Sequence, residues 1–413
     1  MNKKKVGRDL FYGWYIVAAG FIIMGTAFGI AINCASLFIK PISDDLGFSR
    51  SAINATLTLR QIVMMFIAVF AGRIFSKFDI KRMMRVSTIV LFVSFFSLSF
   101  SKSILMFYFL TIILSISVSL LAIIPVSLII NNWFHEKRGL AIGIAFMGSG
   151  VGGMIFNSLA GHWIMNYGWQ RTYQILALIM LLFIFPCTFF ILHIKPKDIG
   201  LKAFGEAADF SQGGSGGELK GVTLAEALKS HQFWLVFLII TAISICISTL
   251  MTSISPHLSD IGYSVSYSAN IVALSMGSLA LGKIALGYLY DRLGITKTNI
   301  ISGIATVGGI LGLLYGQYFF SLVLIIIGSG LGCAFGTIAN PIITQEVFGA
   351  KDYTSIYGLL SAASSLGGII SPVLNGVFYD KTGSYNTFFI ISATIGLMSI
   401  FMQKFVFSKE IKA

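Results

Sequence analysis

Two basic side chains stand out in this sequence because they lie inside long apolar segments. Lys283 occurs in SMGSLALGKIALGYLYDRLG and Arg60 in ATLTLRQIVMMFIAVFAGR. A charge at the centre of a membrane helix costs about 2.5–3.5 kcal/mol on insertion scales, and intramembrane ionisable residues are functional by default. No Asp or Glu falls in the middle of an apolar segment. The simplest counter-ion for both cations is therefore an anion that arrives from solution.

The two cations offer different anion chemistry. The planar guanidinium of Arg60 matches a carboxylate through two parallel hydrogen bonds, whereas the ammonium of Lys283 is a point charge. Arginine keeps its proton, but a desolvated lysine can lose it. Lys283 could thus carry a proton together with an anion, or stay charged and require the exchange of one anion for another. The sequence leaves both mechanisms open.

Each cation also has a purely structural interpretation. Lys283 can extend its side chain toward the membrane surface, and Arg60 can donate to backbone carbonyls of a neighbouring helix. Asn33, Tyr357 and Ser364 are weaker candidates for a central substrate site, since their spacing allows them to reach a central cavity. Each of these three could instead form a hydrogen bond between helices.

The composition indicates a membrane protein. Of the 413 residues, 56% are hydrophobic and 11% are charged, compared with about 25% charged residues in soluble domains. Apolar segments long enough to cross about 30 Å of hydrocarbon recur along the chain, so we expect an all-α integral membrane protein with twelve transmembrane helices. The predicted spans are 12–38, 52–74, 83–101, 104–131, 138–163, 170–193, 232–255, 267–290, 298–318, 320–345, 353–377 and 386–407.

The net charge of +13 reflects membrane topology rather than nucleic-acid binding. Most of the 29 Lys and Arg residues fall in segments on the same side as both termini, which is the positive-inside bias. We therefore expect a multi-pass protein of the plasma (inner) membrane with both termini cytoplasmic. The first apolar run is full length and has no small-residue cleavage site, so it is not expected to be a signal peptide.

Enzyme chemistry is not indicated. The four cysteines fall inside predicted spans without metal-ligand spacing, so we expect neither a metal nor a cofactor. No nucleophile–base pair or Gly-rich phosphate loop is found, and all five histidines lie at span ends or in loops. Because no ATP-binding motif occurs, any transport should be secondary.

The chain is internally duplicated at a fixed offset of 215 residues. PISDDLGFSRS at 41–51 pairs with PHLSDIGYSVS at 256–266. The same offset pairs a series of glycines: Gly72 with Gly287, Gly143 with Gly358, Gly152 with Gly367, Gly161 with Gly376, and Gly168 with Gly383. These glycines either let helices pack closely or contact substrate directly. Arg60 and Lys283 have Ser275 and Ala68 as offset partners, so neither cation belongs to the duplicated scaffold.

The duplication predicts the domain organisation. An even number of spans in each half gives parallel repeats related by an axis along the membrane normal, with the substrate site between them. We expect six-helix bundles at 1–194 and 232–413, related by a pseudo-two-fold axis and joined by a cytoplasmic linker at 195–231. In the linker, SQGGSGG is typical of a flexible segment. Thr223-Leu-Ala-Glu226 is a capping-box pattern that opens a short amphipathic helix.

Two loops resemble those of the major facilitator superfamily. GYLYDRLG at 287–294 resembles the inner loop between spans eight and nine, and GRIFSKFDIKR at 72–82 resembles its counterpart between spans two and three, with Ser76 at the aspartate position. The resemblance implies that these loops gate the carrier. The gating residues it implies are Gly72, Lys77, Gly287, Asp291 and Arg292.

Further motifs resemble the oxalate/formate antiporter family and the related monocarboxylate transporters, over nearly the whole chain. They are YGWYIVAAGF at 12–21, WFHEKRGLAIGIAFMGSGVGG at 133–153, YGWQRTY at 167–173 and SPVLNGVFYDKTGSY at 371–385. In that branch a substrate-binding arginine lies four residues before the loop glycine, and that position is Lys283 here. The span-eleven lysine of the oxalate carrier corresponds to Ser364, and the aspartate of some monocarboxylate transporters corresponds to Leu279.

We therefore expect a secondary active transporter of a small organic anion, a mono- or dicarboxylate. It would act by alternating access, as an antiporter or a proton-coupled symporter, with Lys283 as the principal anion contact and Arg60 as the second. Its partners would be the carboxylate, protons or a counter-anion, and the lipid bilayer, with the monomer as the functional unit. One alternative is an exporter of a larger amphipathic compound in which both cations are structural; another is a non-transporting membrane receptor.

Overall fold

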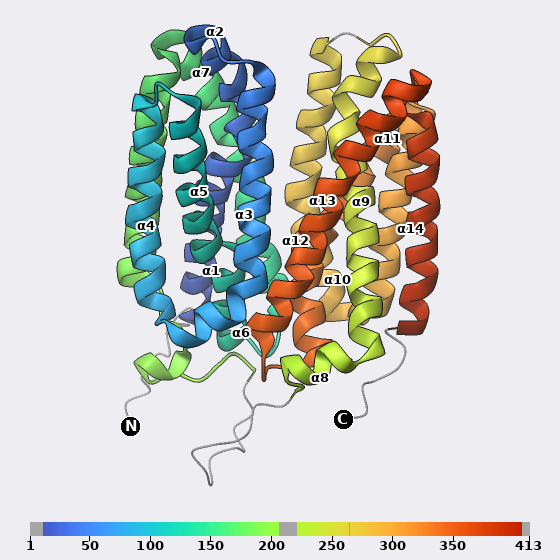
Figure 1. The fold of residues 1–413 in the computed structure, drawn as a ribbon. Coiled ribbons are helices and arrows are strands. Elements are labelled where there is room, and N and C mark those ends of the chain that lie inside the picture. Colours follow the sequence, from blue (N-terminus) through green and yellow to red (C-terminus); the bar gives the residue numbers. More distant parts are fainter. Residues whose placement is uncertain (1–10, 206–220, 264, 407–413) are drawn as a thin grey trace, which may run out of the picture.

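The computed structural model describes residues 11–205, 221–263 and 265–406. Figure 1 shows two groups of long helices side by side, α1–α7 in one and α9–α14 in the other. The first group consists of α1 (Gly13–Ile23), η1 (Met24–Asn33), η2 (Ala35–Phe38), α2 (Ile39–Leu46), α3 (Arg50–Lys77), α4 (Ile80–Ser97), η3 (Leu98–Phe100), α5 (Ile104–Leu121), α6 (Ile123–Trp133), α7 (Arg138–Pro186) and η4 (Cys187–Ile191).

The second group follows a connecting segment. That segment contains η5 (Pro196–Ile199) and α8 (Leu224–Lys229). The helices of the second group are α9 (His231–Asp260), α10 (Val265–Leu314), α11 (Phe319–Ile327), η7 (Gly328–Gly332), α12 (Cys333–Ile343), η8 (Thr344–Phe348), α13 (Tyr353–Thr382) and α14 (Asn386–Val406). We call the two groups the N bundle and the C bundle. The end at which α1 begins and α14 ends is called the terminal end (Figure 1).

Ten helices, counted over the described residues, are long and apolar enough to cross a membrane. The number is smaller than the twelve predicted spans because α7 and α10 each contain two of them. Each of these helices turns at a glycine whose backbone is not helical, Gly168 (φ 77°, ψ 167°) in α7 and Gly294 (φ 74°, ψ 178°) in α10. The twelve predicted crossings are thus accommodated, with two connections reduced to a single-residue turn.

The backbone reproduces the predicted duplication. Gly47 and Gly262 are offset partners, and both have positive φ angles of 69° and 99°. Gly168 and Gly383 are also partners, with φ angles of 77° and 67°. A residue with a Cβ atom rarely adopts this left-handed region, which is why glycine stands at each position. Equivalent points of the two halves therefore share a glycine with positive φ, although the ψ angles of Gly168 (167°) and Gly383 (11°) differ.

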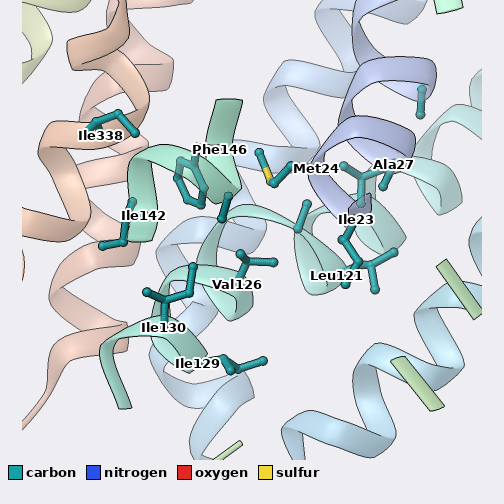
Figure 2. Close-up of a cluster of buried hydrophobic side chains, with 14 of the residues drawn as sticks. Ile23, Met24, Ala27, Leu121, Val126, Ile129, Ile130, Ile142, Phe146 and Ile338 are labelled. Atoms are coloured by element: carbon teal, nitrogen blue, oxygen red, sulfur yellow. The ribbon is translucent and has the colours of Figure 1, made fainter. Parts of the chain in front are cut away.

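The hydrophobic core runs from one bundle into the other. Figure 2 shows part of it, with Ile23 of α1, Leu121 of α5, Ile130 of α6 and Phe146 of α7 gathered together. The same cluster of buried side chains includes Ile338 of α12, in the C bundle. Lipid-facing helices have little hydrophobic reason to associate, so close packing of such side chains and of small residues holds the bundles together.

The part of the connecting segment that contains α8 is attached to the C bundle, whereas Phe204, before it, hydrogen-bonds to Trp133 O of the N bundle. The predicted capping box is confirmed: the Thr223 hydroxyl accepts from Glu226 N (3.3 Å), and the Glu226 carboxylate accepts from Thr223 N (2.6 Å). These hydrogen bonds lower the pKa of Glu226. Leu224 N donates to the carboxylate of Asp352 (2.7 Å), at the start of α13. The predicted flexible stretch SQGGSGG lies outside the described residues.

Candidate functional site

A cavity of about 380 Å³ lies where the two bundles face each other. Its wall comes from η1, α3, α5 and α6 of the N bundle and from α9, α12 and α13 of the C bundle. The described lining residues are apolar or carry hydroxyl or amide groups, and none of them is charged. The polar ones are Gln61, Ser119, Ser244, Ser248, Thr337, Asn340, Tyr357, Ser361, Ser364 and Ser365. The cavity therefore offers hydrogen bonds and apolar surface to a small molecule.

Two of the predicted substrate-site residues line this cavity. Tyr357 and Ser364 both lie on α13. Asn340 of α12, which the sequence did not single out, donates its side-chain N–H to the Ser364 hydroxyl (2.8 Å). The amide oxygen of Asn340 is buried without a hydrogen-bond partner in the described chain. A buried acceptor without a partner is costly, so this oxygen could accept from a ligand once a small side-chain movement exposes it to the cavity.

Lys283 lies at the contact between the bundles. Its side chain is only 4% exposed, and its ammonium donates to the Ser149 hydroxyl (2.7 Å) and to Phe146 O (3.3 Å). Both partners belong to α7 of the N bundle, whereas Lys283 belongs to α10 of the C bundle. The side chain therefore does not extend to the membrane surface. Lys283 is not among the residues that line the central cavity.

Arg60 lies inside the N bundle. Its guanidinium donates to the backbone carbonyl of Ala31, in η1. This is the purely structural role for Arg60, a hydrogen bond to the backbone of a neighbouring helix. Arg60 lines a second cavity of about 50 Å³ together with Thr56, Thr111 and Tyr173. Arg60, expected from the sequence as the second anion contact beside Lys283, instead lies in surroundings separate from those of Lys283. Depth along two paired helices places both side chains near mid-membrane but does not fix which way each one faces.

Asn33 also lies away from the central cavity. It is the last residue of η1, and its side-chain N–H donates to Ser149 O of α7 (2.9 Å). This bond joins two helices of the same bundle. Asn33 thus has the structural role open to it from the sequence, a hydrogen bond between helices. Ser149 thus contacts Asn33 through its backbone and Lys283 through its hydroxyl.

The predicted gating residues of the second repeat contact α7. The Asp291 carboxylate accepts from Gly139 N and from Leu140 N, each at 2.9 Å. These N–H groups belong to the first turn of α7, where a negative charge is stabilised by the helix dipole. Gly287 packs against the backbone of Gly139 so closely that a Cβ atom would not fit. The Arg292 guanidinium lies over the Tyr288 ring, 5.4 Å from its centroid.

The matching loop of the first repeat makes a different contact. Gly72 of α3 packs against Ser355 of α13. Ser76 stands where the second repeat has Asp291, and its hydroxyl donates back to Arg73 O (3.1 Å) in its own helix. Lys77 is exposed. We call the α7–α10 contact the polar seam and the α3–α13 contact the glycine seam.

Both seams lie toward the terminal end. In the polar seam a Cβ atom at Gly143 would come within 2.6 Å of Lys283 O. In the glycine seam the approach is closer still, because a Cβ atom at Gly358 would come even nearer to Ala68 O. At Gly161 and Gly376, farther along the same helices, a Cβ atom would meet nothing within 4 Å. Figure 1 likewise shows α3 and α13 converging at the terminal end and diverging away from it. The bundles are therefore closed against each other at the terminal end.

Comparisons with known proteins agree with this architecture. A family model described as the Major Facilitator Superfamily matches residues 17–340 and 304–412. The oxalate:formate antiporter of Oxalobacter formigenes is 22% identical over 98% of this chain and 95% of its own length. Monocarboxylate transporter 13 of Bos taurus is 21% identical over 92% of this chain and 86% of its own length. A riboflavin transporter, RibJ of Trypanosoma cruzi, is 28% identical, but the match spans only 43% of this chain and 38% of the relative.

The fold is also that of a solved transporter. The proton:xylose symporter XylE, bound to 6-bromo-6-deoxy-D-glucose, superposes with a TM-score of 0.72 at 14% identity, covering 96% of both chains. At this identity the likeness concerns the fold alone. With the family model covering nearly the whole chain, the conclusion is direct: the chain belongs to the Major Facilitator Superfamily of membrane transporters.

Proposed function

We propose that this transporter moves a small organic anion, a mono- or dicarboxylate, by secondary active transport with alternating access. The observation that carries the proposal is the environment of Lys283. Its ammonium is buried, both of its hydrogen-bond partners are neutral, and both belong to the opposite bundle. No described carboxylate contacts it, so the charge lacks a counter-ion of its own.

Opening the terminal end would remove both partners from Lys283. The polar seam is the contact between α7 and α10, and separating these helices takes Ser149 and Phe146 away from the ammonium. A buried cation left without partners is strongly unfavourable. A substrate carboxylate can replace the two neutral acceptors and also supply the counter-charge that they do not provide. A bound anion would thus favour opening, and this couples substrate to the conformational change.

The central cavity would bind the rest of the substrate. Its volume of about 380 Å³ falls in the range of small-molecule sites, about 300–1,000 Å³. Tyr357, Ser364 and Gln61 would donate hydrogen bonds to carboxylate or hydroxyl oxygens, and Asn340 Oδ1 would accept one. Arg60 has no part in this site, because it lines a different cavity.

The relatives support the substrate class. Two relatives that align over most of this chain are named for oxalate and formate and for monocarboxylates. Two coupling mechanisms fit Lys283. A permanently charged lysine would require anion exchange, whereas a lysine that loses its proton when empty would give proton symport. We propose that the monomer acts in the plasma membrane with cytoplasmic termini, in keeping with the positive-inside bias.

Uptake into proteoliposomes tests the proposal. Labelled formate, lactate and oxalate are offered with and without internal anion and with and without a pH gradient. We expect uptake by the wild-type protein and loss of uptake in Lys283→Met, with Lys283→Arg as the matched control that keeps the charge. A need for internal anion indicates exchange, and uptake driven by the pH gradient alone indicates symport. Normal uptake of these anions by Lys283→Met would refute the anion site.

A second function is favoured by the neutral lining of the central cavity. No described lining residue is charged, and both buried cations already have protein partners. A larger amphipathic compound would then be the substrate, with Lys283 and Arg60 structural. The same vesicles distinguish the two functions, because this alternative predicts no carboxylate uptake. It also predicts that an amphipathic dye moves equally in the wild type and in Lys283→Met.

A further inference from the structure

We infer that the second cavity, inside the N bundle, is a binding site for a small monovalent anion of the size of chloride or formate. The site is separate from the central cavity and from Lys283. Its basis is the combination of an enclosed space, a buried guanidinium and polar groups around it.

The cavity has room for a small ion. Its volume is about 50 Å³, and a water molecule takes up about 30 Å³ of liquid. The polar groups on its wall are Arg60, Thr56, Thr111 and Tyr173, and the remainder of the wall is apolar. The ring of Tyr173 is fixed by stacking on Phe38, with the centroids 4.0 Å apart. A larger organic anion would not fit without displacing these side chains.

The charge of Arg60 calls for a counter-ion. The side chain is 7% exposed, and its guanidinium donates one hydrogen bond within the described chain, to Ala31 O. A guanidinium has five N–H donors, and no Asp or Glu is among the described residues that line the cavity. Because buried charges in proteins are usually paired with an opposite charge, an anion beside Arg60 would satisfy both the charge and the remaining donors.

The site is particular to the N bundle. The offset partner of Arg60 is Ser275, which is fully buried and whose hydroxyl has no hydrogen-bond partner among the described atoms. The C bundle therefore has no cation at the equivalent position. In the N bundle the cavity joins η1, α3 and the second half of α7 through Ala31, Arg60 and Tyr173. An anion bound there would hold these three segments together and raise the stability of the bundle.

Thermal unfolding of the full-length protein in lipid nanodiscs tests the inference. Sodium chloride or formate is titrated against sodium gluconate at constant ionic strength, because gluconate is too large for the cavity. We expect the wild-type melting temperature to rise saturably by about 2–6 °C in chloride or formate. In chloride, which is not a proposed substrate, Arg60→Met should lose this rise and Lys283→Met should keep it, which separates this site from the proposed substrate site.

A second measurement locates the ion and covers a variant that fails to fold. Crystals of the wild-type protein grown in bromide should give an anomalous peak beside Arg60. Thr111→Val, which removes one hydroxyl and keeps the side-chain shape, should weaken the chloride effect. Equal melting temperatures in chloride and gluconate, with no bromide peak in the wild type, would show that the cavity holds only water. That result would overturn the inference.

Discussion

The two seams that join the bundles are related by the repeat but differ in chemistry. In both, a glycine packs on the backbone of the opposite bundle: Gly143 on Lys283 O and Gly358 on Ala68 O. Lys283 and Ala68 are themselves offset partners. The backbones thus approach in the same way at both seams, and the difference lies in the side chains. One seam has a lysine where the other has an alanine.

The contrast continues at the terminal end. Asp291 accepts two backbone hydrogen bonds from the first turn of α7, whereas Ser76 bonds within its own helix and does not reach α13. The glycine seam closes without any charged group at either position. The glycine seam therefore closes through small residues and shape alone, whereas the polar seam adds charged side chains that can both strengthen its closure and serve a further purpose. We assign that purpose to the coupling between substrate and conformation.

The largest effect is expected where the seams are alike. In Gly143→Val and Gly358→Val the new Cβ atom would collide with a backbone carbonyl of the opposite bundle, so the terminal end could not close. Both variants should lose transport almost completely. Labelling of single cysteines introduced along α3 and α7 would show whether both variants stay open at the terminal end. Gly161→Val, which meets open space, is the matched control and should transport normally. A defect in only one of the two variants would contradict a shared role for the seams.

The next effect separates the seams. Lys283→Met should lower carboxylate transport by about 10- to 100-fold, since a hydrogen bond to a charged group contributes about 1.5–3 kcal/mol. Ala68→Met, the matched change in the glycine seam, introduces the same side chain without removing a charge. If both methionine variants transport equally poorly, packing rather than charge limits the carrier, and the polar seam has no special role.

Removal of the Asp291 charge should have a smaller effect. A carboxylate at an exposed helix N-terminus contributes about 0.3–1 kcal/mol. Asp291→Asn should therefore shift the carrier toward the state that is open at the terminal end, by up to about fivefold. The readout is the labelling rate of a cysteine placed in that contact, with Arg292→Gln as a neighbouring control. An unchanged labelling rate would mean that the two hydrogen bonds to α7 do not hold the seam closed.

The smallest effect tests the comparison by making the seams more alike. By the repeat, Ser76→Asp would place a carboxylate toward Thr354 N in the first turn of α13, the counterpart of Gly139 N; Ser355 N already donates to Asp352 O (3.1 Å). The dipole of α13 would stabilise this charge. We expect the glycine seam to open more slowly and transport to fall by a few-fold, reversed in part by 0.5 M salt. Faster transport would show that a carboxylate at this position does not stabilise the closed glycine seam as Asp291 stabilises the polar seam.

Much of the fold could be predicted from the sequence, because hydropathy and the repeated glycines report on membrane crossings directly. The ten-helix count differed from the prediction only where Gly168 and Gly294 turn the chain within one residue. Such short turns contain too few polar residues for the sequence to mark them as loops between two helices. The repeated glycines also indicate close helix packing, which the structure shows at Gly143 and Gly358.

The candidate site was harder to predict because depth in the membrane does not determine the direction of a side chain. Arg60 and Lys283 were both placed near mid-membrane, yet one faces the inside of its bundle and the other faces the opposite bundle. Asn340 and Gln61 line the central cavity, but nothing in the sequence around them indicates a substrate site. A single amide in an apolar segment is equally typical of a contact between helices, as Asn33 proved to be.

In the proposed transport cycle, Lys283 exchanges its partners on α7 for a substrate carboxylate. Calorimetric titration of the purified protein with formate, lactate and oxalate tests it most directly, using wild type, Lys283→Met and Ser149→Ala. We predict that the wild type binds at least one of these anions and that Lys283→Met binds none. Ser149→Ala should bind several-fold more tightly, because the ammonium loses a competing partner. Undiminished binding by Lys283→Met would contradict the claim.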